Sequence, residues 1–129
     1  MLPHAPERIV IADDEPQIVN LLDFFLALHG FQPIRTSDGP SALAAIRTNH
    51  GQVALLLTDM EMGPMSGIAL ANRAISEFPT IPVLFMSGSA VQADELQRSF
   101  PGCGFLKKPF SPAALLDAVT LLVPSHVHS

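Results

Sequence analysis

The stretch "VALLLTDMEMG", residues 53–63, decides the fold class of this 129-residue chain. An unbroken apolar run over residues 53–57 reaches Thr58 and then a carboxylate, Asp59. An uninterrupted apolar strand is typical of a parallel sheet that is covered on both faces, so residues 53–58 are predicted to form such a strand. Asp59 alone is equally compatible with a helix cap or a solvated turn. Its role depends on what stands at the ends of the neighbouring strands.

Strand and helix signals alternate along the rest of the chain. Short apolar segments predict four further strands, at residues 8–12, 31–36, 82–86 and 104–107. Apolar residues at helical spacing, with Pro near the starts and Gly or Pro at the ends, predict five helices, over roughly residues 16–29, 40–50, 66–78, within 91–100, and over 112–123. Pro33 favours an edge position for the strand that contains it. Together these elements predict an α/β fold of three layers, a doubly wound parallel sheet with helices on both faces.

Composition narrows the class of protein. The hydrophobic fraction of 48% and charged fraction of 15% indicate a globular chain, and its length suits one domain. Nucleic acid is not an expected partner, because the net charge is −5 and the seven Lys and Arg residues form no basic run. A single cysteine excludes an internal disulfide and fits a reducing cytoplasm. No segment resembles a signal peptide or a membrane span, so the expected location is cytoplasmic, without membrane contact.

Polar residues gather where the predicted strands end. In a parallel sheet these ends share one edge, which is where ligands bind. The residues there are Asp13, Asp14, Asp59, Ser87 and Lys108. Three neighbouring carboxylates repel one another unless a cation holds them together, and Mg²⁺ suits oxygen ligands of this kind. A carboxylate beside Mg²⁺, a lysine and a hydroxyl is a set of groups that can carry out phosphoryl transfer, with Asp59 as the nucleophile that forms an acyl phosphate.

Four segments resemble, in order and at the expected spacing, the signature segments of response-regulator receiver domains from two-component signalling. They are "IVIADDEP" (9–16), "LLLTDMEM" with "MSG" (55–67), "PVLFMSG" (82–88) and "GFLKKPFSPAALLDAV" (104–119). The resemblance covers residues 7–123 and implies a receiver domain there, with residues 1–6 and 124–129 as flexible tails. It also implies a flavodoxin-like sheet of five strands in the order 2-1-3-4-5.

The resemblance assigns roles to residues at the strand ends. Asp59 is implied as the phosphoacceptor and Lys108 as the lysine that contacts the phosphoryl group. Asp13, Asp14 and Asp59, with the backbone carbonyl of Glu61, are implied as the ligands of Mg²⁺ or Mn²⁺. The loop after Asp59 departs from the usual pattern, since its proline stands one residue later than is common.

Further roles concern switching and the lifetime of the phosphorylated state. Ser87 is implied to bind the phosphoryl group and, with Phe105, to form a switch in which the ring moves into space that the hydroxyl vacates. A plain core aromatic is the alternative role for Phe105. Glu61 and Ser89 stand where the family sets the lifetime of the acyl phosphate.

The function expected is a signalling module and not an enzyme that acts on an outside substrate. Its phosphodonor would be a sensor histidine kinase or a histidine phosphotransfer protein. An unknown downstream protein would read the surface formed by the predicted helix within 91–100, the strand at 104–107 and the helix over 112–123. A monomer or weak dimer is expected. No output segment is recognised within residues 1–129, so we expect either a stand-alone receiver or a fragment of a hybrid histidine kinase.

Three other functions are compatible with parts of this pattern. A haloacid-dehalogenase-type phosphatase also uses an Asp nucleophile and Mg²⁺, but it needs a second Asp where Glu61 stands, and it needs a cap domain. A flavodoxin needs a Ser/Thr/Gly-rich phosphate loop after the first strand, where this chain has two acids. A receiver fold that acts without phosphorylation is the nearest alternative, and the complete set of five polar residues argues against it.

Overall fold

The computed structural model describes residues 5–89 and 93–124. Strands and helices alternate in the order β1 (Arg8–Ala12), α1 (Pro16–Leu28), β2 (Gln32–Thr36), α2 (Gly39–Thr48), β3 (Leu55–Asp59), α3 (Gly67–Glu77), β4 (Val83–Ser87), α4 (Ala93–Ser99), β5 (Gly104–Lys107) and α5 (Pro112–Leu122). Most of both predicted tails lies outside the described residues. Within the described part of the chain, no helix is both long and apolar enough to cross a membrane.

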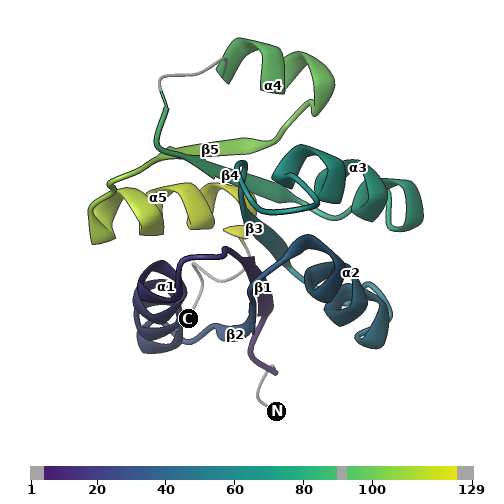
Figure 1. Ribbon diagram of the computed structural model, residues 1–129. Helices are drawn as coiled ribbons and strands as arrows, with labels where there is room; N and C mark the ends of the chain where they lie inside the picture. Colours follow the sequence, from purple (N-terminus) through teal and green to yellow (C-terminus); the bar gives the residue numbers. More distant parts are fainter. Residues whose placement is uncertain (1–4, 90–92, 125–129) are drawn as a thin grey trace.

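The five strands form one sheet in the order β2-β1-β3-β4-β5, and every neighbouring pair is parallel (Figure 1). The predicted fold class and strand order are therefore confirmed. Pro33 lies in β2 at the edge of the sheet, where its missing N–H removes no bond to a further strand. Because the order reverses between β1 and β3, the carboxyl ends of these two strands flank the crevice in which α/β proteins bind ligands.

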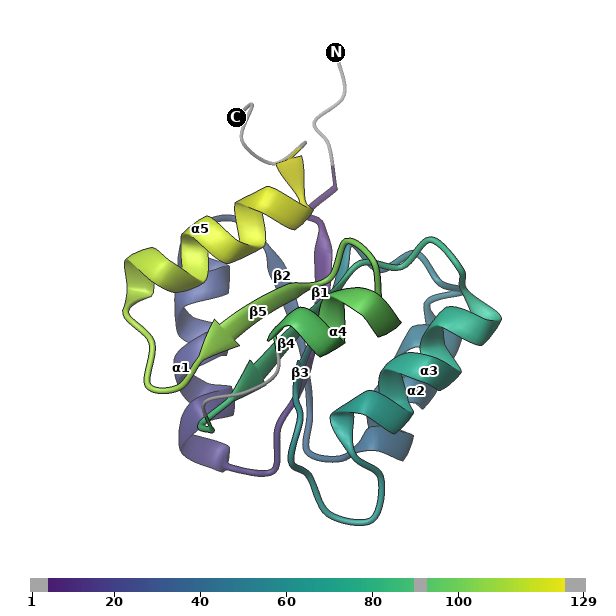
Figure 2. The same cartoon turned by 90° about the horizontal axis from the view of Figure 1, so that it is seen from above.

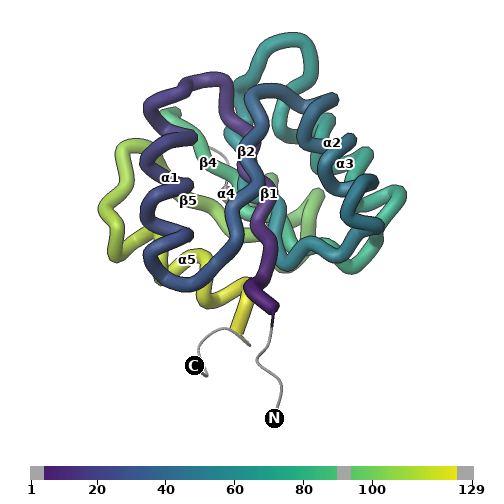
Figure 3. The backbone as a smooth tube through the Cα atoms, turned by 90° about the horizontal axis from the view of Figure 1, so that it is seen from below, coloured from purple at the N-terminus to yellow at the C-terminus, as the bar shows by residue number. Residues whose placement is uncertain are grey.

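The alternating side chains of each strand fill two separate cores. Ile9 and Ile11 of β1 face the core beneath α1 and α5, whereas Val10 and Ala12 face the core beneath α2, α3 and α4. Figures 2 and 3 show α2 and α3 side by side, on the side of the sheet opposite α1. Since both faces are covered, the central strands β3 and β4 are buried along their whole length. This rigid sheet positions the loops at its carboxyl edge.

The structure corrects the predicted bounds of β3 and β4. We predicted β3 over residues 53–58, but it begins at Leu55 and includes Asp59 as its last residue. Asp59 pairs in register with Met86, and the Met60 N–H donates to the Met86 carbonyl at 2.9 Å, which carries the pairing past the apolar run. Likewise β4 ends at Ser87 and not at Met86. Both polar residues are therefore held by the sheet itself.

Serine residues cap the N-termini of α3 and α5. Ser111 stands before α5, and its Oγ accepts a hydrogen bond from the Ala114 N–H at 3.1 Å. Ser66 caps α3 in the same way through the Ala69 N–H, at 3.1 Å. These bonds satisfy N–H groups that have no partner inside the helix, and they determine where each helix begins.

Candidate functional site

Asp59 is a nearly buried carboxylate at the carboxyl end of β3, with 5% of its surface exposed. Its Oδ1 accepts a hydrogen bond from the Glu61 N–H at 3.3 Å, so the loop that follows orients it. The same loop is closed by the Gly67 N–H, which donates to the Met60 carbonyl at 3.0 Å. A Cβ atom on Gly67 would lie only 2.1 Å from the Asp59 carbonyl oxygen. Glycine therefore allows α3 to begin against the backbone of Asp59.

Two further acids follow β1 and approach Asp59. Asp13 is fully buried, and its Oδ1 accepts a hydrogen bond from the Glu15 N–H at 2.9 Å, whereas Asp14 is exposed. One carboxylate oxygen from each of Asp13, Asp14 and Asp59 lies within 4.8 Å of the other two. The acids that the sequence predicted at one edge of the sheet do lie together.

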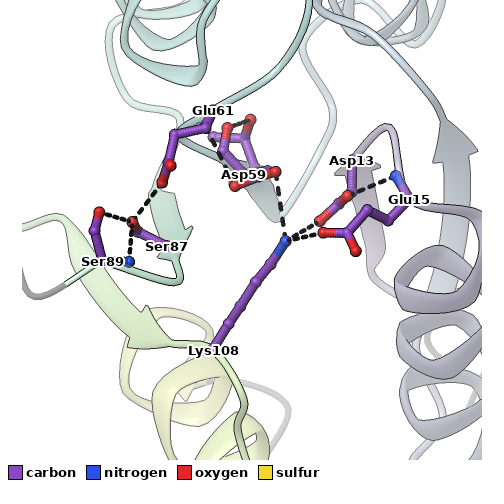
Figure 4. Close-up of polar contacts among 8 residues, drawn as sticks. Asp13, Glu15, Asp59, Glu61, Ser87, Ser89 and Lys108 are labelled. Carbon is purple, nitrogen blue, oxygen red and sulfur yellow. Dashed lines mark hydrogen bonds and ion pairs between the residues drawn. The ribbon is translucent and has the colours of Figure 1, made fainter.

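Lys108 extends from the end of β5 into this acidic group (Figure 4). Its Nζ donates to Asp13 Oδ2 at 2.8 Å and lies 3.4 Å from Asp59 Oδ2. It also contacts Glu15 Oε1 at 3.2 Å. The Lys108 N–H donates to the Ser87 carbonyl at 2.8 Å, which ties the base of this side chain to β4. The ammonium group of Lys108, the residue after β5, thus contacts both the acid that follows β1 and the acid that ends β3.

Burial and charge act on the titration of these groups in opposite ways. Burial raises the pKa of Asp59, and the Asp13 charge adds to this, while the Glu61 N–H and the Lys108 charge lower it by less. Burial lowers the pKa of Lys108, but the hydrogen bond to Asp13 and the charges of Asp13 and Asp59 raise it above its ordinary value overall. The site therefore holds a firmly protonated lysine beside a carboxylate whose anion is poorly solvated.

Ser87 and Glu61 meet on the other side of Asp59 (Figure 4). Ser87 is fully buried at the end of β4, and its Oγ donates to Glu61 Oε1 at 2.7 Å. It accepts a hydrogen bond from the Ser89 N–H at 3.1 Å, and the two serine hydroxyl oxygens lie 3.0 Å apart. This contact joins the loop after β3 to the loop after β4.

Not every predicted residue lies among these contacts. Phe105 lies in β5, in register with Phe85, and packs half-buried against the core beneath α2, α3 and α4. Lys107, the last residue of β5, is exposed. Glu15 was not predicted although it contacts Lys108; it holds the N-cap position of α1 without capping the helix through its side chain. The sequence signal that could have identified Glu15 is its place directly after Asp13 and Asp14.

The donor set fits a hard divalent cation. It consists of three carboxylates, two of them nearly or fully buried, and oxygen ligands of this type suit Mg²⁺. A buried pair of acids is costly without positive charge, and Lys108 supplies only one unit against Asp13 and Asp59 together with the exposed Asp14 and Glu15. The charge balance of the site thus leaves a place for a further cation.

Comparison with known proteins agrees with this geometry. The family described as "Response regulator receiver domain" matches residues 9–120. Response regulator GtcR of Aneurinibacillus migulanus is 34% identical over 114 residues, which are 88% of this chain and 45% of that protein. The chain therefore spans less than half of the length of this relative.

Solved structures give the same result. A response regulator receiver protein from Sinorhizobium medicae superposes with a TM-score of 0.81 at 28% identity, over 94% of this chain and 97% of that one. The receiver domain of the hybrid histidine kinase CckA superposes with a TM-score of 0.78, also at 28% identity, over 90% of this chain and 98% of that one. The chain thus belongs to the response regulator receiver domains of two-component signalling.

Proposed function

We propose that this chain is a phosphorylatable receiver in which Asp59 takes a phosphoryl group from the phosphohistidine of a sensor histidine kinase or a histidine phosphotransfer protein. The observation that carries the proposal is the setting of Asp59, a nearly buried carboxylate that lies 3.4 Å from the Lys108 ammonium and shares a cluster with Asp13 and Asp14. In the transfer, an Asp59 oxygen forms a bond to phosphorus as the bond from phosphorus to the donor nitrogen breaks. The imidazole leaves with its electron pair and takes up a proton.

The poor solvation of Asp59 favours its role as nucleophile. Burial destabilises its anion relative to a carboxylate in water, which is the same effect that raises its pKa. Forming an acyl phosphate replaces this buried charge by an ester-like oxygen and moves the charge outward onto the phosphoryl oxygens. Lys108 is within reach of those oxygens and stabilises the charge that they carry.

Asp13, Asp14 and Asp59, with the Glu61 backbone carbonyl, would hold Mg²⁺ or Mn²⁺. When bound, the ion neutralises charge on the transferred phosphoryl group. Lys108 keeps its own role beside it, because Asp13 presents two oxygens and uses only Oδ2 for the lysine. We expect the protein to act as a signalling module, with catalysis limited to its own phosphorylation and dephosphorylation.

The output would be a rearrangement of the α4–β5–α5 surface. The Ser87 hydroxyl would turn to a phosphoryl oxygen, and the Phe105 ring would move into the space that it leaves. Phe105 is suited to this because it is only half-buried and packs against the core that contains Leu96 of α4. A movement of its ring would therefore alter the packing beneath α4, where a downstream protein partner would bind.

Intact mass spectrometry after incubation with Mg²⁺ and acetyl phosphate tests the proposal. Wild type should gain the mass of one phosphoryl group, and Asp59→Asn should gain none. Adding EDTA before the phosphodonor should abolish the gain in wild type. A wild-type protein that binds Mg²⁺ yet gains no mass would exclude phosphorylation at Asp59 and would favour a receiver that signals through protein contacts alone.

A further inference from the structure

The single proton of the Ser87 hydroxyl is already used in a hydrogen bond. It donates to Glu61 Oε1 at 2.7 Å and accepts from the Ser89 N–H at 3.1 Å. A serine hydroxyl has one O–H, so the 3.0 Å contact with Ser89 Oγ must be donated by Ser89. Ser87 is fully buried, and a buried hydroxyl that lost its acceptor would be costly.

The phosphorylated state of the proposed function, on which this inference rests, requires the same proton. A phosphoryl group on Asp59 needs hydrogen-bond donors for its oxygens, and Ser87, fully buried at the end of the neighbouring strand β4, is a hydroxyl that can supply one. A carboxylate and a phosphoryl group are both anionic oxygen acceptors that take short, charge-assisted hydrogen bonds. Glu61 therefore supplies to Ser87, in advance, the kind of acceptor that phosphorylation would bring.

The two ends of Glu61 are anchored differently. Its backbone N–H donates to Asp59 Oδ1 at 3.3 Å, which holds the residue beside the phosphoacceptor. Its side chain is exposed and leans across to Ser87 (Figure 4). An exposed carboxylate is readily hydrated when it is released, whereas the buried Ser87 hydroxyl must find another acceptor at once.

We propose that the Glu61 carboxylate is a competing acceptor that holds Ser87 in the unphosphorylated protein. For phosphorylation of Asp59 to be completed, the Ser87 O–H must then break its hydrogen bond to Glu61 and donate to a phosphoryl oxygen instead. The released Glu61 side chain rotates into the solvent. Repulsion between the incoming phosphoryl charge and the Glu61 charge drives the release. Glu61 is in this sense a positioning residue that acts through Ser87 and slows phosphorylation.

Two substitutions separate this mechanism from simple charge repulsion of the phosphodonor. Glu61→Asp keeps the negative charge but is one methylene shorter, so it does not reach Ser87. Glu61→Gln keeps the length and offers Ser87 a neutral, weaker acceptor. We expect Glu61→Asp to speed the initial rate of phosphorylation by about three- to tenfold, and Glu61→Gln to speed it by less. Charge repulsion alone would leave Glu61→Asp at the wild-type rate with Glu61→Gln the faster variant, and that order would overturn the proposal.

The measurement is the initial rate at which the phosphorylated mass appears, with saturating Mg²⁺ and acetyl phosphate. Initial rates keep hydrolysis of the acyl phosphate from disguising a change in its formation. Asp94→Asn, which removes a charge from an exposed position on α4, should phosphorylate like wild type. Circular dichroism of each variant checks that it is folded, as expected for a change at the exposed Glu61 side chain.

A double-mutant cycle tests whether Glu61 acts through Ser87. We expect Ser87→Ala to phosphorylate more slowly than wild type, and in that background Glu61→Asp should no longer change the rate. An acceleration of equal size in that background would overturn the proposal. A wild-type protein that gains no phosphoryl mass would refute the proposed function and this inference together, whereas normal phosphorylation of wild type with an unchanged Glu61→Asp rate would refute this inference alone.

Discussion

Replacing Gly67 by alanine tests how closely the phosphoacceptor depends on the start of α3. Gly67 is the first residue of the helix and has no positive φ, so its backbone conformation does not require glycine. An added Cβ would nevertheless lie 2.1 Å from the Asp59 carbonyl oxygen and 2.9 Å from Met60 Cα. Real Cβ atoms stay at least 3.0 Å from such neighbours, so the backbone must move by about 3.0 − 2.1 = 0.9 Å.

Two effects of opposite sign decide the stability of Gly67→Ala. Alanine is a better helix former than glycine by up to about 1 kcal/mol. Overpacking against the backbone costs about 1–3 kcal/mol, and here no flexible side chain is present to yield. We therefore expect a net loss of about 1–2 kcal/mol in the free energy of unfolding. Urea unfolding followed by circular dichroism measures it, because the chain has no Trp or Tyr.

The larger effect is expected on phosphorylation. Relieving this contact separates the start of α3 from the backbone of Asp59 by nearly 1 Å, which disturbs the position of Asp59 relative to Lys108 and the acidic cluster. Misplacement of that size costs reactions on the order of 100-fold in rate. Gly63→Ala is the matched control from the same loop, since a Cβ there meets nothing within 4 Å. If Gly67→Ala matches Gly63→Ala in both stability and phosphorylation rate, the close approach is not what positions Asp59.

Three further predictions concern stability. Ser111→Ala removes the cap of α5 and should lower the free energy of unfolding by about 1 kcal/mol. Leu70→Ala, at a fully buried position in α3, should lower it by about 2–5 kcal/mol in the same urea titration. Asp59→Asn should raise it at pH 7 without Mg²⁺, because folding places a charged Asp59 where its pKa is raised. That gain in stability should vanish as the pH falls through the raised pKa of the folded protein toward the ordinary value of 3.8, because wild type then protonates Asp59. A gain that stays constant with pH would show that the charge on Asp59 is not its cause.

The convergence of the acidic residues could be predicted from the sequence, because it depends only on the direction of the strands. Once the strands are parallel, their carboxyl ends lie at one edge, and whatever polar residue ends each strand is brought there. Asp13, Asp59 and Ser87 followed from this rule although they lie far apart in the chain. The bounds of β3 did not follow, because the apolar run that begins at Val53 passes from a partly buried connection into the buried strand without any change of residue type.

The contacts of the Glu15 and Glu61 side chains could not be predicted from strand direction. Glu15 and Glu61 both lie in loops, two residues after Asp13 and Asp59, and each donates its backbone N–H to that aspartate. The repeated spacing makes the two backbone contacts predictable in principle. The two side chains nevertheless diverge, Glu15 toward Lys108 and Glu61 toward Ser87, because each takes the nearest donor that its own loop leaves within reach.

That divergence explains why this acidic site is not a set of equivalent carboxylates. Asp13 and Glu15 lie on the lysine side, where each contacts the Lys108 ammonium group. Glu61 lies on the hydroxyl side, where its only partner among the described side chains is Ser87. A new anion on Asp59 would therefore meet attraction from Lys108 and competition from Glu61 at the same time. The rate of phosphorylation should accordingly respond to the length of the side chain at position 61, and not only to its charge.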